Sequence, residues 1–249
     1  FDQINQSDLD AITKEITANF AHSTVTGASS LGDVWGVELS LIGGMTKTPE
    51  IERRVKEVDP QTTVSSLPDV VLAAQVSVPY GITGELAFFP AVGSESFRFS
   101  NLGLGVKWTL TQGLLELPLD IAVKVNYTTT NLSFTQTINN ASTGNVPVDS
   151  KVESKTNTLG YGVFVSKELA LIEPYAGLTF LNAKSDLSVS GTGTIFDTTY
   201  TNGQSGSSSP SGTMFTLGVD LSLAIIKIGA EFNSVLGTQR YLGKLALSF

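Results

Sequence analysis

The sequence has no cysteine, a single histidine and little positive charge. Without cysteine, disulfide bonds, a thiol nucleophile and a lipid-carrying N-terminal cysteine are all excluded. With only His22 as an imidazole ligand, a zinc site is not expected, and neither is any other metal or cofactor. Lys and Arg number 15 against 23 Asp and Glu, and this acidic balance argues against a nucleic-acid partner, because phosphate binding needs clustered positive charge.

The chain also lacks a long apolar run. No stretch approaches the roughly 18 to 20 apolar residues that a membrane-spanning helix requires. Yet 41% of the 249 residues are hydrophobic and only 15% are charged, which is apolar for a soluble domain of this size. If such a chain spans a bilayer, it does so as a closed barrel, since lipid leaves no backbone group unpaired without a large cost. The start at Phe1, without Met or an apolar signal run, predicts a processed, exported form.

Two periodicities divide the chain. At the N-terminus, Ser7 can cap a helix in which Leu9, Ile12, Ile16 and Phe20 follow at helical spacing. From about residue 33 the period changes to 2 and stays there to the end. The sequence therefore predicts an N-terminal amphipathic helix and linker over residues 1–30, periplasmic or at a barrel mouth, and a transmembrane β-barrel over residues 31–249.

About ten strands follow this alternation, each apolar on one face and polar or small on the other. The clearest has an apolar row at Leu102, Leu104, Val106, Trp108 and Leu110, which alternates with Asn101, Gly103, Gly105, Lys107 and Thr109. In a later strand the apolar row moves from odd to even positions, at Leu132 and Phe134. This shift predicts a β-bulge near residues 128–130.

Connection lengths alternate along the chain, as in outer-membrane barrels, which have short turns at one rim and long loops at the other. The long connections fall at residues 45–67, 90–100, 136–150 and 191–212. The first should contain a short helix that starts at Pro49, and the last, rich in Gly, Ser and Thr, should be mobile. An even strand number places both termini on the short-turn side, with the N-terminal helix beside or inside the periplasmic mouth. The predicted fold is all-β, a single antiparallel up-and-down transmembrane β-barrel.

A soluble, secreted β-sandwich is the main alternative, because its strands also alternate. Two features disfavour it. The strands cluster near the roughly 9 to 11 residues that cross a tilted bilayer. Aromatic residues such as Trp35, Trp108, Tyr127 and Phe232 recur near strand ends on the apolar face, as interface girdles require.

The last nine residues carry a family resemblance. Tyr241, Gly243, Leu245, Leu247 and Phe249 alternate up to an aromatic C-terminus, which resembles the C-terminal signal of bacterial outer-membrane barrels. The resemblance implies recognition by the barrel-assembly machinery, and an integral location in the bacterial outer membrane.

A second resemblance runs through the middle of the chain. It rests on Leu67-Pro68, Pro79-Tyr80-Gly81, Phe89-Pro90, the segment from Leu102 to Lys107, and the segment from Leu117 to Ile121. This pattern is similar to a family of small uncharacterised outer-membrane barrels and to porin-like barrels of predatory bacteria that assemble into rings and trap lipid. The motifs are mostly turn sequences, and no ligand-binding residue follows from them.

Charged side chains of both signs fall on the face opposite the apolar rows. These candidates for the lumen are Glu38, Glu85, Lys107, Asp120, Lys124, Asp220, Lys227, Glu231 and Lys244. We interpret them as a network that fills a narrow lumen; a selective ion path is the alternative. Barrels of eight strands are filled by side chains, whereas open channels need about sixteen.

Catalysis is not expected. Barrel proteases and phospholipases use a histidine as base, and His22 lies outside every expected strand, at the surface or facing a mouth. Two functions remain: a porin-like, homo-oligomeric barrel with a structural or lipid-holding role, or a narrow channel for small solutes or hydrophobic compounds. Membrane lipid is the expected partner, and the neighbouring inward positions Gly103 and Gly105 could form a groove for an acyl chain.

Overall fold

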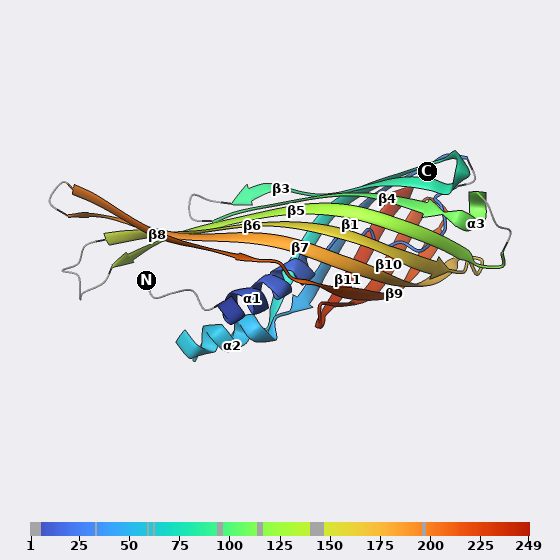
Figure 1. Ribbon diagram of the computed structural model, residues 1–249. Coiled ribbons are helices and arrows are strands. Elements are labelled where there is room, and N and C mark those ends of the chain that lie inside the picture. Colours follow the sequence, from blue (N-terminus) through green and yellow to red (C-terminus); the bar gives the residue numbers. More distant parts are fainter. Residues whose placement is uncertain are drawn as a thin grey trace.

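Strands with alternating side chains make up most of the chain in the computed structural model, which describes residues 6–32, 34–58, 60–61, 63–93, 97–113, 117–139, 147–195 and 198–249 (Figure 1). The barrel strands are β1 (Gly36–Lys47), β2 (Ser66–Val78), β3 (Ile82–Gly93), β4 (Phe97–Thr109), β5 (Asp120–Asn139), β6 (Pro147–Ser166), β7 (Ile172–Ile195), β9 (Ser211–Leu223), β10 (Ile226–Val235) and β11 (Thr238–Ser248). The remaining elements are α1 (Gln6–Asn19), α2 (Pro49–Val58), the 3-10 turn η1 (Pro79–Gly81), α3 (Leu110–Gly113) and β8 (Thr198–Ser208).

The sheet closes on itself. Neighbouring strands pair antiparallel in chain order, β1 pairs with β11, and β6 pairs with β7. β8 pairs only with the outer part of β7, and β9 pairs with the inner part, so β8 and β9 follow one another along the same edge. The barrel therefore has ten strand positions, which confirms the predicted single antiparallel up-and-down barrel.

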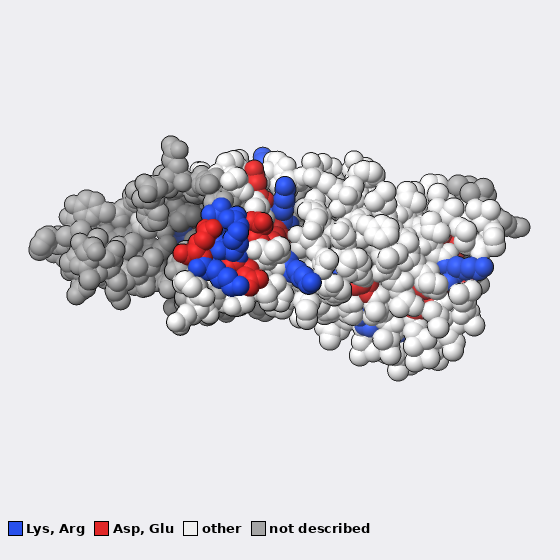
Figure 2. All heavy atoms as spheres, turned by 90° about the horizontal axis from the view of Figure 1, so that it is seen from below, with Lys and Arg blue, Asp and Glu red and all other residues white. Residues whose placement is uncertain are grey.

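The outer wall of the barrel is apolar. Large hydrophobic side chains that point away from the lumen are exposed on every side, among them Leu39, Leu41, Leu104, Val125, Leu217 and Leu245. Aromatic pairs lie on this surface, with ring centroids 5.7 Å apart for Tyr161 and Phe180 and 5.3 Å for Phe232 and Tyr241. Figure 2 shows one face, on which charged side chains gather over α2 while the barrel wall carries few. A closed barrel with this apolar belt is an integral protein of the bacterial outer membrane.

The two rims differ, as predicted, but the long connections are mostly strand. β5 and β6 extend to Asn139 and from Pro147, and β7 and β8 pair as far as Ile195 and Thr198. The expected loops at residues 90–100, 136–150 and 191–212 are thus largely hairpin extensions, which Figure 1 shows projecting beyond the barrel. Thr favours strands, but the sequence predicted loops here because both faces of these extensions are polar. The loop predicted to be mobile, at residues 191–212, is strand over most of its length, and its residues 196–197 lie outside the described residues.

The helix α2 begins at Pro49, as predicted, but the bulge does not occur where it was expected. The ladders of β5 with β4 and β6 run through residues 128–130 without a shift. The register shifts instead between Phe89 and Val92 of β3, beside Pro90, which has no N–H to donate.

The N-terminal helix lies at the other mouth from the one predicted. α1 contacts α2 and β8, which belong to the long-hairpin rim, and by the usual orientation of outer-membrane barrels this rim faces outward. None of the described helices is long and apolar enough to cross a membrane.

Candidate functional site

The chain between α1 and β1 passes through the barrel lumen. We call residues 21–32 the plug segment, because they run from the long-hairpin mouth to the short-turn mouth. Its contacts order it along this path: Arg240 of β11 donates to the carbonyl of Ala21 at 2.6 Å, and the amide of Leu31 donates to Ser77 Oγ near the opposite rim at 3.0 Å. A segment without secondary structure of its own must satisfy its backbone groups with side chains, and inward residues of the strands provide them.

Lys107 holds the part of the plug segment that is nearer the short-turn mouth. Its Nζ donates to the carbonyl oxygens of Gly27 at 2.9 Å and Ser29 at 2.7 Å. Thr109 Oγ1 donates to the carbonyl of Ala28 at 2.6 Å, and the Ala28 amide donates to Ser166 Oγ at 3.0 Å. The alternation of β4 thus places a cation and a hydroxyl against three consecutive plug residues.

His22 anchors the part of the plug segment that is nearer the long-hairpin mouth. The expectation of a histidine at the surface or facing a mouth is wrong. Its Nε2 lies 2.9 Å from Glu85 Oε2, and both side chains are fully buried. Lys124 Nζ lies 2.8 Å from the same carboxylate oxygen. The sequence alone showed no partner for His22, because the partner comes from a strand 63 residues away.

Gly103 and Gly105 line the lumen directly beneath His22. A Cβ on Gly103 would come within 2.6 Å of His22 Nδ1, and one on Gly105 within 3.0 Å of His22 Nε2. The two glycines do form a groove, but an imidazole occupies it, so their absent side chains make room for the plug segment.

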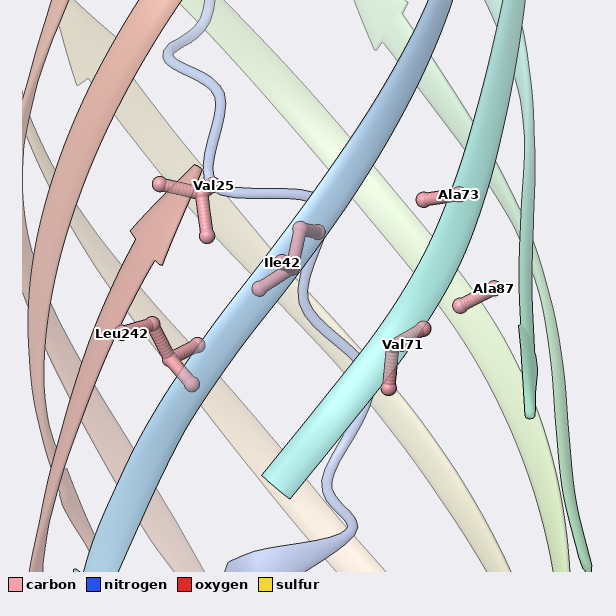
Figure 3. Packing of buried hydrophobic residues seen from close by; sticks show 6 residues of the cluster. All are labelled: Val25, Ile42, Val71, Ala73, Ala87 and Leu242. Carbon is pink, nitrogen blue, oxygen red and sulfur yellow. The ribbon is translucent and has the colours of Figure 1, made fainter. Parts of the chain in front are cut away.

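An apolar patch inside the lumen receives Val25 of the plug segment. Figure 3 shows Val25 with Ile42, Val71, Ala73, Ala87 and Leu242, all buried. Ile42, Val71 and Leu242 each follow an apolar outward residue directly in sequence. Two consecutive apolar residues break the period of 2. These pairs are the feature of the sequence that indicates an apolar inner wall here.

The structure places most of the predicted inward charges inside the lumen. Seven of the nine are buried and two are half-buried: the buried ones are Glu38, Glu85, Lys107, Lys124, Asp220, Glu231 and Lys244, and the half-buried ones are Asp120 and Lys227. Lys244 Nζ lies 3.0 Å from Glu38 and 2.7 Å from Asp220, and Lys227 lies 3.5 Å from Glu38. Asp120, near the short-turn rim, accepts a hydrogen bond from Thr111 at 2.9 Å.

Sequence reasoning missed one lumen ion pair, that of Asp69 with Arg240. Both residues stand at inward positions of β2 and β11, so the alternation could have identified them. The cavities beside His22 are small, about 10 Å³ each, which leaves room for about one water molecule. These two cavities leave no space for a substrate beside the histidine.

The residues of the C-terminal signal lie on the outer face. The exposed, lipid-facing side chains at the end of the chain include Tyr241, Leu245, Leu247 and Phe249. The amide of Phe249 donates to the carbonyl of Val37 at 2.8 Å, and the Val37 amide donates back at 2.9 Å. The last residue thus completes the seam between the first and last strands.

A separate cavity, of about 440 Å³, lies at the long-hairpin rim. α1, α2 and strands β2 to β5 provide its walls, which are almost entirely apolar: Ile16, Asn19, Phe20, Ile51, Leu67, Pro68, Asp69, Val70, Phe89, Phe99 and Leu132. We call this cavity the apolar pocket. Ring centroids of Phe20 and Phe99 are 4.5 Å apart, and those of Phe89 and Phe99 are 5.2 Å apart.

The pocket explains one of the two apolar residues at even positions of β5. Leu132 is half-buried and lines the apolar pocket, whereas Phe134 is exposed, and neither marks a bulge. The sequence signal was correct, but it was assigned to the wrong structural cause.

The wall of the barrel is incomplete beside this pocket. β2 and β3 pair from Val78 with Ile82 only as far as Leu72 with Phe88, although β2 begins at Ser66 and β3 continues to Gly93. Pro68 and Pro90 stand in the two unpaired parts, where neither can donate to a ladder. On the other side of β2, Pro68 pairs with Met45, whose side chain is still part of the exposed apolar surface. The gap, which we call the β2–β3 seam, therefore lies at the outer part of the apolar belt.

The two helices are joined by a buried carboxylate. Glu15 of α1 accepts hydrogen bonds from the amides of Glu50 at 2.7 Å and Ile51 at 2.9 Å, in the first turn of α2. Burial raises the pKa of the Glu15 carboxyl, although these two amides oppose the effect. The contact fixes α2, and with it Ile51, over the apolar pocket.

A larger cavity of about 800 Å³ is lined by β4 to β8. Its walls carry Arg98, Glu153, Lys155 and Asp186 among serines, so its charges are mixed, and Phe99 and Leu132 line both this cavity and the apolar pocket. Among the described residues no group of three or more His, Cys, Asp or Glu side chains could hold a metal ion.

Several solved outer-membrane barrels resemble the chain. The translocator domain of the autotransporter NalP from Neisseria meningitidis is 9% identical, with a TM-score of 0.47 over 98% of this chain and 95% of that one. The outer membrane protease OmpT from Escherichia coli is 10% identical, with a TM-score of 0.41 over 91% and 100%. The P. putida toluene transporter TodX is 10% identical, with a TM-score of 0.36 over 96% and 70%. At such low identities and scores these likenesses say nothing about activity.

Comparison with curated proteins finds no match. Residues 3–238 match the family described as "Family of unknown function (DUF6588)". Because this match covers nearly the whole chain, the protein belongs to that family.

Proposed function

We propose that this protein is a plugged outer-membrane barrel that takes small hydrophobic molecules from the outer leaflet into the apolar pocket. The observation that carries the proposal is the pocket itself: a cavity of about 440 Å³ whose walls are almost entirely apolar. Its volume falls in the range of about 300 to 1,000 Å³ that is typical of small-molecule sites.

The β2–β3 seam supports the route. A backbone that faces lipid without hydrogen-bond partners is costly, so an unpaired stretch of two neighbouring strands is expected only where it serves a purpose or is covered. Here the two unpaired stretches border the apolar pocket, and Val70 both lines the pocket and is exposed on the outer wall. A molecule dissolved in the outer leaflet would reach the pocket without crossing water.

The filled lumen supports binding over free diffusion. Lys107, His22 and Arg240 hold the plug segment along its length, and the cavities beside it have room for about one water each. A diffusion pore for polar solutes would need a wider path. Catalysis has no part in the proposal, because the only histidine is buried and hydrogen-bonded to Glu85. Homo-oligomerisation and recognition by the barrel-assembly machinery stay predictions from the sequence.

Binding of the fluorescent apolar probe N-phenylnaphthylamine to protein held in amphipol tests the proposal. Leu67→Glu places a carboxylate in the apolar pocket alone, and Leu187→Glu places one at the larger cavity of the long hairpins; both leucines are half-buried. We expect saturable binding to the wild type and to Leu187→Glu, and none to Leu67→Glu. Equal binding to all three proteins would refute the proposal.

A further inference from the structure

A row of inward residues crosses five neighbouring strands beside the apolar pocket. The strand registers pair Phe99 of β4 with Leu132, Leu132 with Ser154, Ser154 with Leu187, and Leu187 with Gly206 of β8. We call these five residues the inner row. Phe99 and Leu132 line both the apolar pocket and the larger cavity, and the other three line the larger cavity. The inner row therefore continues the wall of the pocket into the larger cavity.

The large side chains of the inner row are apolar, whereas the next row toward the membrane is polar. Within the inner row, Phe99, Leu132 and Leu187 are only half-buried, although they point inward. Two residues closer to the membrane along each strand, the inward positions are all buried and polar: Asn101, Thr130, Thr156, Ser185 and Ser208. An apolar ligand is therefore favoured across the strands, along the inner row, and not deeper in the lumen.

The length of the inner row suits a long hydrocarbon chain. Neighbouring strands are about 4.8 Å apart, so the row measures about 19 Å along the wall. The hydrocarbon core of a bilayer is about 30 Å thick, and the lipid chains of one leaflet span about half of it. One such chain can start in the apolar pocket and follow the inner row as far as Leu187.

The helix α1 lies beside the inner row and contacts both of its ends. Phe20, just after α1, packs on Phe99 with ring centroids 4.5 Å apart. At the other end, a Cβ on Gly206 would come within 2.8 Å of Leu9 Cδ2, so Leu9 lies directly against this glycine. The distance from Leu9 to Phe20 along a helix is about 16 Å, close to the length of the row. The helix and the wall thus border one elongated space.

We infer that the ligand of the apolar pocket is a molecule with one long, unbranched hydrocarbon chain, which lies along the inner row. The inference rests on the proposed function and adds the chemical class of the ligand. The end of the chain fills the apolar pocket, and the polar end of the molecule lies in the larger cavity, among its serines and charged residues. A compact molecule would fill the pocket alone and gain nothing from contact with Leu187.

Two isomeric acids separate the length of the chain from its hydrophobicity. Hexadecanoic acid and 2-hexyldecanoic acid have the same atoms and the same carboxylate, but only the first has a single long chain. We expect hexadecanoic acid to displace N-phenylnaphthylamine from the wild-type protein in amphipol at about tenfold lower concentration, an effect that corresponds to about two additional buried methylene groups. This comparison uses the wild type alone, so it does not depend on the folding of a variant.

The variant Leu187→Glu interrupts the inner row and leaves the apolar pocket unchanged. We expect it to bind N-phenylnaphthylamine as the wild type does, which shows that it is folded, but to lose most of the preference for hexadecanoic acid. The control is Asn182→Glu, which adds the same charge to β7 at an exposed position outside both cavity linings and should keep the wild-type preference.

The outcomes separate the two proposals. If the wild type binds both acids equally, or if Leu187→Glu keeps the preference, the inference is wrong, while saturable binding of N-phenylnaphthylamine still supports the proposed function. If the wild type binds neither acid and no N-phenylnaphthylamine, the proposed function itself fails.

Discussion

At the scale of single residues, the lumen is shaped as much by missing side chains as by charges. Gly103 and Gly105 leave the space that His22 fills, and His22 in turn meets Glu85 of the next strand. The inward position of Glu85 could be predicted from the alternation of β3. The position of His22 could not, because a segment without periodicity gives no indication of which wall it will contact.

Gly103→Val should therefore weaken the fold. The added Cβ would come within 2.6 Å of His22 Nδ1, so either the imidazole or the strand must shift. Overpacking of this kind costs about 1 to 3 kcal/mol. Thermal unfolding, followed on heat-modifiable gels, should show a clear loss of stability.

Gly43→Val is the matched control for Gly103→Val. Gly43 lies on the outer face of β1, and nothing is within 4 Å of its added Cβ. This variant should be as stable as the wild type. If the two variants unfold at the same temperature, His22 does not occupy the space over Gly103.

At the scale of elements, the plug segment has no hydrogen-bonded structure of its own and depends on the strands around it. Lys107 is the main support at its lower end, where one ammonium binds two carbonyl oxygens. Hydrogen bonds to a charged group contribute about 1.5 to 3 kcal/mol each. Losing this side chain would leave both carbonyls unpaired inside the barrel.

Lys107→Met should loosen the plug segment and leave the barrel assembled. Hydrogen exchange of residues 21–32 should become faster, while the ladders of β4 and β5 stay protected. Lys184→Met, which changes an exposed lysine of β7, is the control and should exchange as the wild type does. Unchanged exchange in residues 21–32 of Lys107→Met would mean that other contacts hold the plug.

The elements also show how far the sequence could be read. The barrel strands were predictable, because an apolar outer face and a polar inner face give a clean period of 2. The hairpin extensions of β5 to β8 were not, since above the membrane both faces are polar and the alternation disappears. The apolar pocket did leave a trace, in the even-numbered Leu132, but one strand's parity cannot distinguish an apolar inner wall from a bulge.

At the scale of the whole molecule, three features combine in one place. The ladder of β2 with β3 stops short of the outer part of both strands, the plug segment fills the lumen below, and α1 and α2 cover the space above. The apolar pocket lies where these three meet, next to the outer end of the apolar belt. The proposed function uses this arrangement: the plug segment fills the axial path, and the ligand enters through the β2–β3 seam.

The most direct test of this account is photolabelling in lipid nanodiscs with an aliphatic alcohol that carries a diazirine, followed by mapping of the labelled peptides. The account predicts labels on pocket residues such as Ile51, Phe99 and Leu132, and predicts that excess octanol removes these labels while labels on lipid-facing residues such as Leu217 remain. Labels confined to the lipid-facing surface, with none in the pocket, would contradict it.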